Sequence, residues 1–334
     1  MRARKHIFSV DTHTMGEPTR VIIGGMRPIP GKTMAEKKDF LRDHLDHIRT
    51  ALMLEPRGHN DMFGSILMDP TDSQADLGIV FMDAAGYLNM CGHGTIGAVT
   101  VALEMGLLEL IEPVTKVTLD TPSGLVFASA ETEGGLVKSV TLENVPSFLY
   151  REGIQIDLPE MGRIPVDIAF GGNFFALVDN THVRLKIVPE NVGKLVEAGM
   201  NILRQVNRET EINHPTKNHL RSVDLVEIHE LVEGSKARGR NVVIFGKGQV
   251  DRSPCGTGTC AKMATLFAKG KLSLGEEFIQ ESIIGTTFSG RLIRQTLVGD
   301  IPAVIPEISG QALITGIQQF VIDPADPLKY GFRI

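Results

Sequence analysis

Two cysteines, each followed by a glycine-rich segment, are the residues of this sequence best suited to do chemistry. Residues 91–95 read Cys-Gly-His-Gly-Thr, and residues 255–259 read Cys-Gly-Thr-Gly-Thr. A strand-like segment precedes each motif and a helix follows it, so both cysteines are expected at a helix N-terminus. That position favours a thiolate and lowers its pKa, and the backbone N–H groups that follow can hold an anion. The pattern therefore indicates a thiolate beside an anion cradle, twice in one chain.

The two motifs align without gaps and are separated by close to half of the 334 residues. A repeat of this length indicates a duplicated domain, with one cysteine at the same place in each half. A lone free cysteine is often only a small buried apolar residue, but the matched positions of Cys91 and Cys255 argue against that interpretation. The third cysteine, Cys260, occupies the place of Ile96 in the first copy, so we interpret it as a packing residue.

Two similar acid/base groups from two similar halves suit the inversion of a carbon centre. A base removes the proton from one face, an acid delivers a proton to the other, and the roles exchange for the opposite enantiomer. The anion cradle would hold a carboxylate and stabilise the developing enolate charge. The sequence thus predicts a cofactor-independent racemase or epimerase of an amino-acid-like carboxylate. The alternative from another class is a non-enzymatic anion-binding module with incidental cysteines, which alkylation with substrate protection would distinguish.

Motifs that would indicate another function are less specific than the two cysteine motifs. Residues 92–97 fit the dinucleotide pattern Gly-x-Gly-x-x-Gly, and Asp120 follows at a strand end, but regular βαβ alternation is missing. A dehydrogenase also gives no reason for a cysteine before both loops. No complete Gly-x-x-x-x-Gly-Lys-Ser/Thr sequence is present, which argues against a P-loop. His44 and His47 lie on one helix beside acidic residues, and no three-ligand metal spacing is visible, so no metal is expected.

The composition agrees with a globular protein of about two domains, with 42% hydrophobic and 22% charged residues. Lys and Arg number 34 against 40 Asp and Glu, a net charge of −6, which argues against nucleic-acid and anionic-membrane partners. The chain has no apolar run of about 18 residues that would span a membrane. The three cysteines form no disulfide framework, and we expect a cytoplasmic protein with reduced thiols.

The secondary-structure pattern indicates an α/β (α+β) fold that is rich in antiparallel strands and has few helices. A capping box of Thr33 and Glu36 begins the first expected helix. Helices are expected over 33–56, 98–106, 188–207 and from the second glycine-rich turn to 270. Strands are expected at 7–11, 20–23, 65–68, 77–81, most of 115–180, 221–230 and 241–245, and again in the C-terminal tail.

Four segments, 11–17, 55–62, 89–95 and 251–259, closely resemble the proline racemase family, and the resemblance covers essentially the whole chain. It implies the diaminopimelate-epimerase-like fold. That fold has two pseudo-symmetric domains, each a barrel-like, mostly antiparallel sheet around a central helix. Here they would be residues 1–123 plus roughly 315–334, carrying Cys91, and residues 124–314, carrying Cys255. The resemblance also implies a homodimer without pyridoxal phosphate, metal or other cofactor.

The resemblance implies a role for each residue of the two motifs. Cys91 and Cys255 would be the two bases, on opposite faces of the substrate α-carbon. Asp251, together with His93, would meet the ring nitrogen of the substrate. The substrate carboxylate would be held by Gly92, His93, Gly256 and Thr257.

The family contains proline racemases, 4-hydroxyproline epimerases and 3-hydroxyproline dehydratases, and the dehydratases carry Thr where this chain has Cys255. Family proline racemases place aromatic rings around the substrate ring, and the matching residues here are Phe63, Phe81 and Phe245. A phenylalanine cannot satisfy a substrate hydroxyl, and an unpaired polar group costs roughly 1–3 kcal/mol. An apolar pocket therefore favours racemisation of L- and D-proline. Because such pockets reject an added hydroxyl only weakly, 4-hydroxyproline 2-epimerase activity stays the alternative to proline racemisation.

Overall fold

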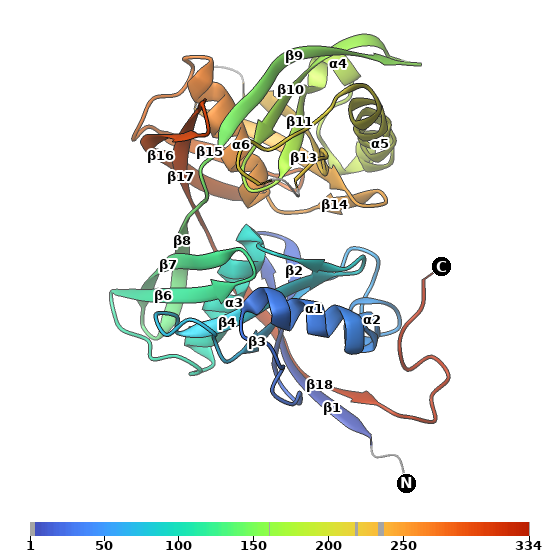
Figure 1. Cartoon of the computed structure of the whole chain (residues 1–334), viewed down its shortest axis with the longest axis vertical. Helices are drawn as coiled ribbons and strands as arrows, with labels where there is room; N and C mark the ends of the chain where they lie inside the picture. Colours follow the sequence, from blue (N-terminus) through green and yellow to red (C-terminus); the bar gives the residue numbers. More distant parts are fainter. Residues whose placement is uncertain (1–3, 160, 218–219, 233–236, 334) are drawn as a thin grey trace. The chain divides into compact units, whose positions relative to one another are not determined.

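The computed structural model describes residues 4–159, 161–217, 220–232 and 237–333, which form two compact units (Figure 1). The first unit contains the described residues up to Leu142 and those from Gly310 onward, and the second contains those from Glu143 to Ser309. The sequence placed the first boundary after residue 123. The structure keeps the next two strands in the first unit because they pair, in order, with the strand that ends at Thr121.

Strands are the main elements of the first unit, and three helices connect them. The strands are β1 (Lys5–Thr14), β2 (Glu17–Gly24), β3 (Phe63–Met68), β4 (Leu77–Asp83), β5 (Tyr87–Leu88), β6 (Val114–Thr121), β7 (Gly124–Glu133), β8 (Leu136–Glu143) and β18 (Ala312–Ile322). The helices are α1 (Met34–His44), α2 (Asp46–Met53) and α3 (Gly92–Glu104).

The second unit has a similar content. Its strands are β9 (Phe148–Leu158), β10 (Gly162–Phe170), β11 (Phe174–Asp179), β12 (Leu225–Leu231), β13 (Arg238–Phe245), β14 (Gln249–Asp251), β15 (Glu277–Glu281), β16 (Thr287–Val298) and β17 (Ile301–Gly310). Its helices are α4 (Asn180–Val183), the 3₁₀ turn η1 (Pro189–Asn191), α5 (Val192–Glu209) and α6 (Gly256–Ala268).

Strand pairing follows one scheme in both units. In the first, β1 pairs antiparallel with β18 and β2, and β2 runs parallel to β3. Strand β4 is antiparallel to β3 and β5 and parallel to β6, and β6, β7 and β8 form an antiparallel meander. The second unit repeats these pairings in the same order and direction. Strand β10 is antiparallel to β9 and β11, and β11 runs parallel to β12. Strand β13 is antiparallel to β12 and β14 and parallel to β15, and β15, β16 and β17 form an antiparallel meander. The duplication indicated by the two cysteine motifs is therefore confirmed as a duplicated topology.

One helix lies at the centre of each unit. Helix α3 contacts β18, β1 and β2 at one end of the strand order and β7 near the other end. Helix α6 likewise contacts β9, β10 and β11 on one side and β16 on the other. A sheet whose two ends touch the same helix is curved around it, so each unit has the expected barrel-like form. Every residue of α3 from Gly92 to Leu103 is buried.

The first helical segment departs from the prediction. The Thr33 hydroxyl accepts from the Glu36 N–H at 3.2 Å, so half of the expected capping box is present. The Glu36 carboxylate instead accepts from the N–H of Lys32. A break at Leu45 then divides the expected single helix into α1 and α2. In the described part of the chain, no helix is both long and apolar enough to cross a membrane.

Candidate active site

Cys91 is the N-cap residue of α3. Its carbonyl oxygen accepts the Thr95 N–H at 3.0 Å and the Thr95 hydroxyl at 2.7 Å. The glycine-rich segment is therefore the first turn of the helix, not a loop before it as the sequence suggested. The Cys91 Sγ lies 3.4 Å from Nδ1 of His93. A ring N–H at this distance stabilises a thiolate, as does the positive end of the helix.

Cys255 caps α6 in the same manner. Its carbonyl oxygen accepts the Thr259 N–H at 2.8 Å and the Thr259 hydroxyl at 2.7 Å. Unlike Cys91, whose φ is −151°, Cys255 has a φ of +61°. A side chain with positive φ costs on the order of 1–3 kcal/mol and persists only where the surroundings hold it. Here the hydroxyl of Ser253 accepts the Cys255 N–H at 3.1 Å.

Asp251 is tied to the same turn. One of its carboxylate oxygens accepts the Ser253 N–H at 2.8 Å and the Ser253 hydroxyl at 2.7 Å. The hydrogen bonds run from Asp251 through Ser253 to the backbone of Cys255, so the end of β14 and the start of α6 form one fixed element. The hydroxyl of Thr257 lies 3.9 Å from the Cys255 Sγ. The structure thus brings Asp251, Cys255 and Thr257 together within the second unit.

The environment of Cys255 corrects one expectation about its thiol. Burial raises the pKa of Cys255 well above its usual value, and the negative charges of Asp251 and Glu227 raise it further. The Gly258 N–H and the Thr257 hydroxyl lower it and offset only part of this effect. The helix N-terminus was expected to favour a thiolate at this cysteine, but burial and two carboxyl groups outweigh it. In the free protein, Cys255 is therefore a thiol near neutral pH.

The helix starts also supply anion-binding groups. The N–H groups of a helical first turn have no carbonyl partner inside the helix, and they point along its axis with the positive end of the helix dipole. These first turns begin at Gly92 and Gly256, and both glycines are buried. Each motif therefore places a thiol next to backbone donors that suit a carboxylate.

Phe63 and Phe81 both lie against the start of α3. A methyl group at Gly94 would meet Cε1 of Phe63 at 2.8 Å and Cδ1 of Phe81 at 3.0 Å. The ring of Phe63 contacts the ring of His93, with centroids 4.4 Å apart, so Phe63, His93 and Cys91 form one cluster. Phe81 is fully buried beneath the helix, which makes it the support of this cluster within the first unit.

Phe245 lies in the second unit, at the end of β13. It pairs with Gln249 across the hairpin whose other strand ends at Asp251, and it is half-buried. The turn of this hairpin therefore connects the candidate substrate-facing ring to the candidate carboxylate.

The sequence analysis missed Glu227, which is fully buried on β12. A signal was available. Residues 225–228 read Leu-Val-Glu-Ile, so Glu227 is a charged residue inside an apolar run. It also precedes Cys255 by the same number of residues as Phe63 precedes Cys91.

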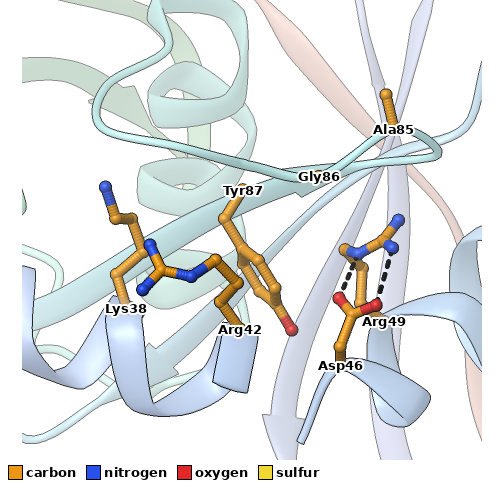
Figure 2. A pocket seen from close by; sticks show the side chains of 7 residues that line it. All are labelled: Lys38, Arg42, Asp46, Arg49, Ala85, Gly86 and Tyr87. Atoms are coloured by element: carbon orange, nitrogen blue, oxygen red, sulfur yellow. Dashed lines mark hydrogen bonds and ion pairs between the residues drawn. The ribbon is translucent and has the colours of Figure 1, made fainter.

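A surface pocket lies elsewhere on the first unit. Figure 2 shows its lining, in which Asp46 binds Arg49 through two hydrogen bonds and the ring of Tyr87 lies between α1 and α2. The remaining lining residues are Lys38, Arg42, Ala85 and Gly86. None of the residues singled out from the sequence as site residues lines this pocket, so it is separate from the cysteine motifs.

Comparison with known proteins gives a consistent result. The family model for proline racemase matches residues 9–333. A proline racemase of Clostridioides difficile is 52% identical over 332 residues, with 99% of each chain covered. A 4-hydroxyproline 2-epimerase of Streptosporangium roseum is 45% identical, with 100% of each chain covered. A crystal structure of a hydroxyproline epimerase from Agrobacterium vitis, with bound trans-4-hydroxy-L-proline, has a TM-score of 0.91 and 37% identity and covers 100% of this chain and 97% of that chain. The protein therefore belongs to the proline racemase family.

Proposed function

We propose that this protein interconverts L-proline and D-proline without a cofactor, with Cys91 and Cys255 as its two acid/base groups. The observation that carries the proposal is the matched position of the two thiols, each at the N-cap of the central helix of one repeat. The family membership and the 52% identity to a proline racemase support the same reaction.

In the proposed reaction, the Cys91 thiolate takes the α-hydrogen of one enantiomer as a proton. The C–H electron pair passes into the carboxylate group, whose growing negative charge is stabilised by the N–H groups of the helix first turns. The Cys255 thiol then gives its proton to the opposite face of the α-carbon, and the electron pair forms the new C–H bond. For the other enantiomer the two cysteines exchange roles. The proposal requires the two thiols to face opposite sides of one α-carbon.

Asp251 and His93 are proposed to bind the ring nitrogen of the substrate, and the first turns that begin at Gly92 and Gly256 its carboxylate. Asp251 is almost fully buried and held by Ser253, which fits a fixed carboxylate that accepts from a substrate ammonium. A carboxylate in that position needs no reorganisation when the substrate binds.

Phe63 supports proline as the substrate over a hydroxylated analogue. Its ring lies next to His93 and has no group that could bond a substrate hydroxyl. The second candidate is 4-hydroxyproline 2-epimerisation, and the observation in its favour is the 45% identity to an enzyme of that name. The same two thiols would perform both reactions, because only the α-carbon is inverted.

Chiral chromatography of L-proline and trans-4-hydroxy-L-proline after incubation with the purified protein tests the proposal. No cofactor is added to the reaction. Formation of D-proline at a much higher kcat/KM than the hydroxyproline epimer supports the assignment. Turnover of hydroxyproline alone contradicts proline as substrate, and turnover of neither contradicts the reaction. A homodimer and a cytoplasmic location stay predictions, and sedimentation analysis and cell fractionation would measure them.

A further inference from the structure

Glu227 is a buried carboxyl that the reaction outlined above does not use. Its exposed fraction is 0%, and among the residues that the structure describes neither carboxylate oxygen has a hydrogen-bond donor. The side chain of Asn241 lies close enough to lower the pKa of this carboxyl, but its amide nitrogen donates to the carbonyl oxygen of Pro254. A buried carboxyl without donors is costly, so its presence calls for a physical reason.

The carboxyl lies beside the Cys255 sulfur. A methyl group at Gly258 would stand 2.7 Å from Oε2 of Glu227 and 3.2 Å from Sγ of Cys255. The two atoms are therefore no more than about 6 Å apart, a range in which a like charge shifts a pKa. Gly258 leaves the space between them open, because any side chain there would meet both.

Further charged groups continue along the same face of α6. Lys262, one helical turn beyond Gly258, is 4% exposed, and its Nζ lies 2.8 Å from Nδ1 of His229 on β12. The positive charge of Lys262 lowers the pKa of Glu227, whereas burial, the larger effect, raises it to about 7. The charged groups that act on Lys262 from neighbouring strands are Glu227, Asp179 and Asp167, and Lys269 acts on it from the C-cap of α6.

The first unit lacks this polar group although it has the same topology. At the corresponding helix position, Gly94 is met by the rings of Phe63 and Phe81. In the gap-free alignment of the two motifs, Lys262 corresponds to Ala98, which is also buried. The fold therefore does not require a buried Glu and a buried Lys inside the barrel. Buried charged groups often contribute no net stability even when they attract one another, so stability alone does not account for Glu227 and Lys262.

We propose that Glu227 is a positioning residue of the reaction: its buried carboxylate holds the proton on the Cys255 thiol, so that the resting enzyme carries its thiolate at Cys91. The proposal rests on the proposed function, in which one thiolate and one thiol are present together. Two equivalent thiols would share the proton equally. The groups next to them differ, since Cys91 has the His93 imidazole at 3.4 Å and Cys255 has two carboxyl groups.

The order of the proton losses explains how Glu227 acts. As the pH rises, Glu227 ionises near pH 7, well before the Cys255 thiol does. The carboxylate then opposes a second negative charge on the nearby sulfur. Asp251 opposes it too, but a bound substrate ammonium would neutralise Asp251. Glu227 lies behind the helix start, against Gly258, so its charge persists throughout the reaction.

The test is the pH dependence of alkylation of each cysteine by iodoacetamide, read by peptide mass spectrometry at low conversion. In the wild-type protein, Cys91 should react faster than Cys255 at pH 8. Glu227→Gln keeps the size of the side chain and removes its charge, so the pKa of Cys255 should fall. A fall of one pKa unit raises the Cys255 alkylation rate below that pKa by about tenfold, and we expect at least this increase.

Glu281→Gln is the matched control. Glu281 is 8% exposed in the same unit and binds Arg238 and Arg240, and it does not act on the Cys255 thiol. This variant should leave the Cys255 profile unchanged. An equal rise of the Cys255 alkylation rate in both variants overturns the proposal, because a general loss of packing in the second unit would then explain the rise. An unchanged profile in Glu227→Gln also overturns it.

Cys260, which is fully buried, reports folding in the same experiment, because it should stay unreactive. If Cys260 reacts in Glu227→Gln, the test is repeated with the double variant Glu227→Gln/Lys262→Met. The double variant removes both buried charges, so the core of the second unit becomes apolar like that of the first. The same increase at Cys255 is expected, and its absence overturns the proposal. Alkylation measures the reactivity of each thiol whether or not the protein racemises proline. Failure of the proposed function would appear in the chiral assay and not in this experiment.

Discussion

Replacing Gly94 by alanine should damage activity far more than stability. The added methyl carbon would lie 2.8 Å from Phe63 Cε1 and 3.0 Å from Phe81 Cδ1, so at least one ring must move. Phe81 is fully enclosed by the core, whereas Phe63 is 4% exposed. Phe63 is therefore the ring that shifts, and its contact with the His93 ring, 4.4 Å away, shifts with it.

The expected magnitudes differ between the two readouts. Overpacking a core costs about 1–3 kcal/mol, and the better helix propensity of alanine returns about 1 kcal/mol. The net loss of roughly 0–2 kcal/mol corresponds to a fall in Tm of at most about 8 °C for a unit of this size. A displacement of about 1 Å at a catalytic cluster can lower the rate by about 10²-fold. We expect kcat/KM for proline to fall by about that factor.

Gly193→Ala is the matched control. Gly193 is also helical, in the first turn of α5, and among the described residues outside its own helical turn no atom lies within 4 Å of an added methyl group. It should leave kcat/KM unchanged and Tm equal or slightly higher. Chiral chromatography measures the first quantity and calorimetry the second. If Gly94→Ala lowers Tm but keeps the wild-type kcat/KM, then Phe63 and His93 do not position the substrate and the reasoning is refuted.

Three further outcomes are expected. Cys91→Ser and Cys255→Ser should each lower the racemisation rate by at least about 10²–10⁴-fold, whereas Cys260→Ser should keep the activity and lower only Tm; near wild-type turnover in either of the first two would contradict two-thiol catalysis. Phe63→Ser should shift the ratio of kcat/KM values from proline towards 4-hydroxyproline by about tenfold, and an unchanged ratio would make Phe63 a core residue only. The pH–rate profile should be bell-shaped, with the two pKa values belonging to the thiol pair; because burial raises the pKa of Cys255, the alkaline limb should lie above the range of an ordinary thiol.

The repeat and its consequences could be predicted because they are local in sequence. The two Cys-Gly-x-Gly-Thr motifs recur with identical spacing, and the Thr95 and Thr259 hydroxyls make the same cap contact in both units. A duplicated motif followed by a helix is enough to infer a duplicated domain. The fold class followed from the strand and helix pattern, and the residues expected around each cysteine followed from the resemblance to proline racemases.

Other features depend on contacts that spacing does not encode. The break at Leu45 interrupts a segment whose apolar pattern continues through it, so periodicity alone predicts one helix. The raised pKa of Cys255 depends on burial, on Asp251 and on Glu227. Glu227 belongs to a strand that pairs with β11 and β13. The helix N-terminus is visible in sequence, but the carboxyl behind it is seen only when the strands are assembled.

Proline racemisation in D₂O tests the central claim most directly. L-Proline is incubated with the protein without any cofactor, and each enantiomer is separated early and examined for deuterium at the α-carbon by mass spectrometry. With two thiols on opposite faces, the proton removed stays on one sulfur and the other sulfur delivers deuterium from solvent. The account predicts D-proline that carries deuterium and remaining L-proline that carries almost none. Deuterium entering L-proline as fast as D-proline forms, or no D-proline at all, would contradict it.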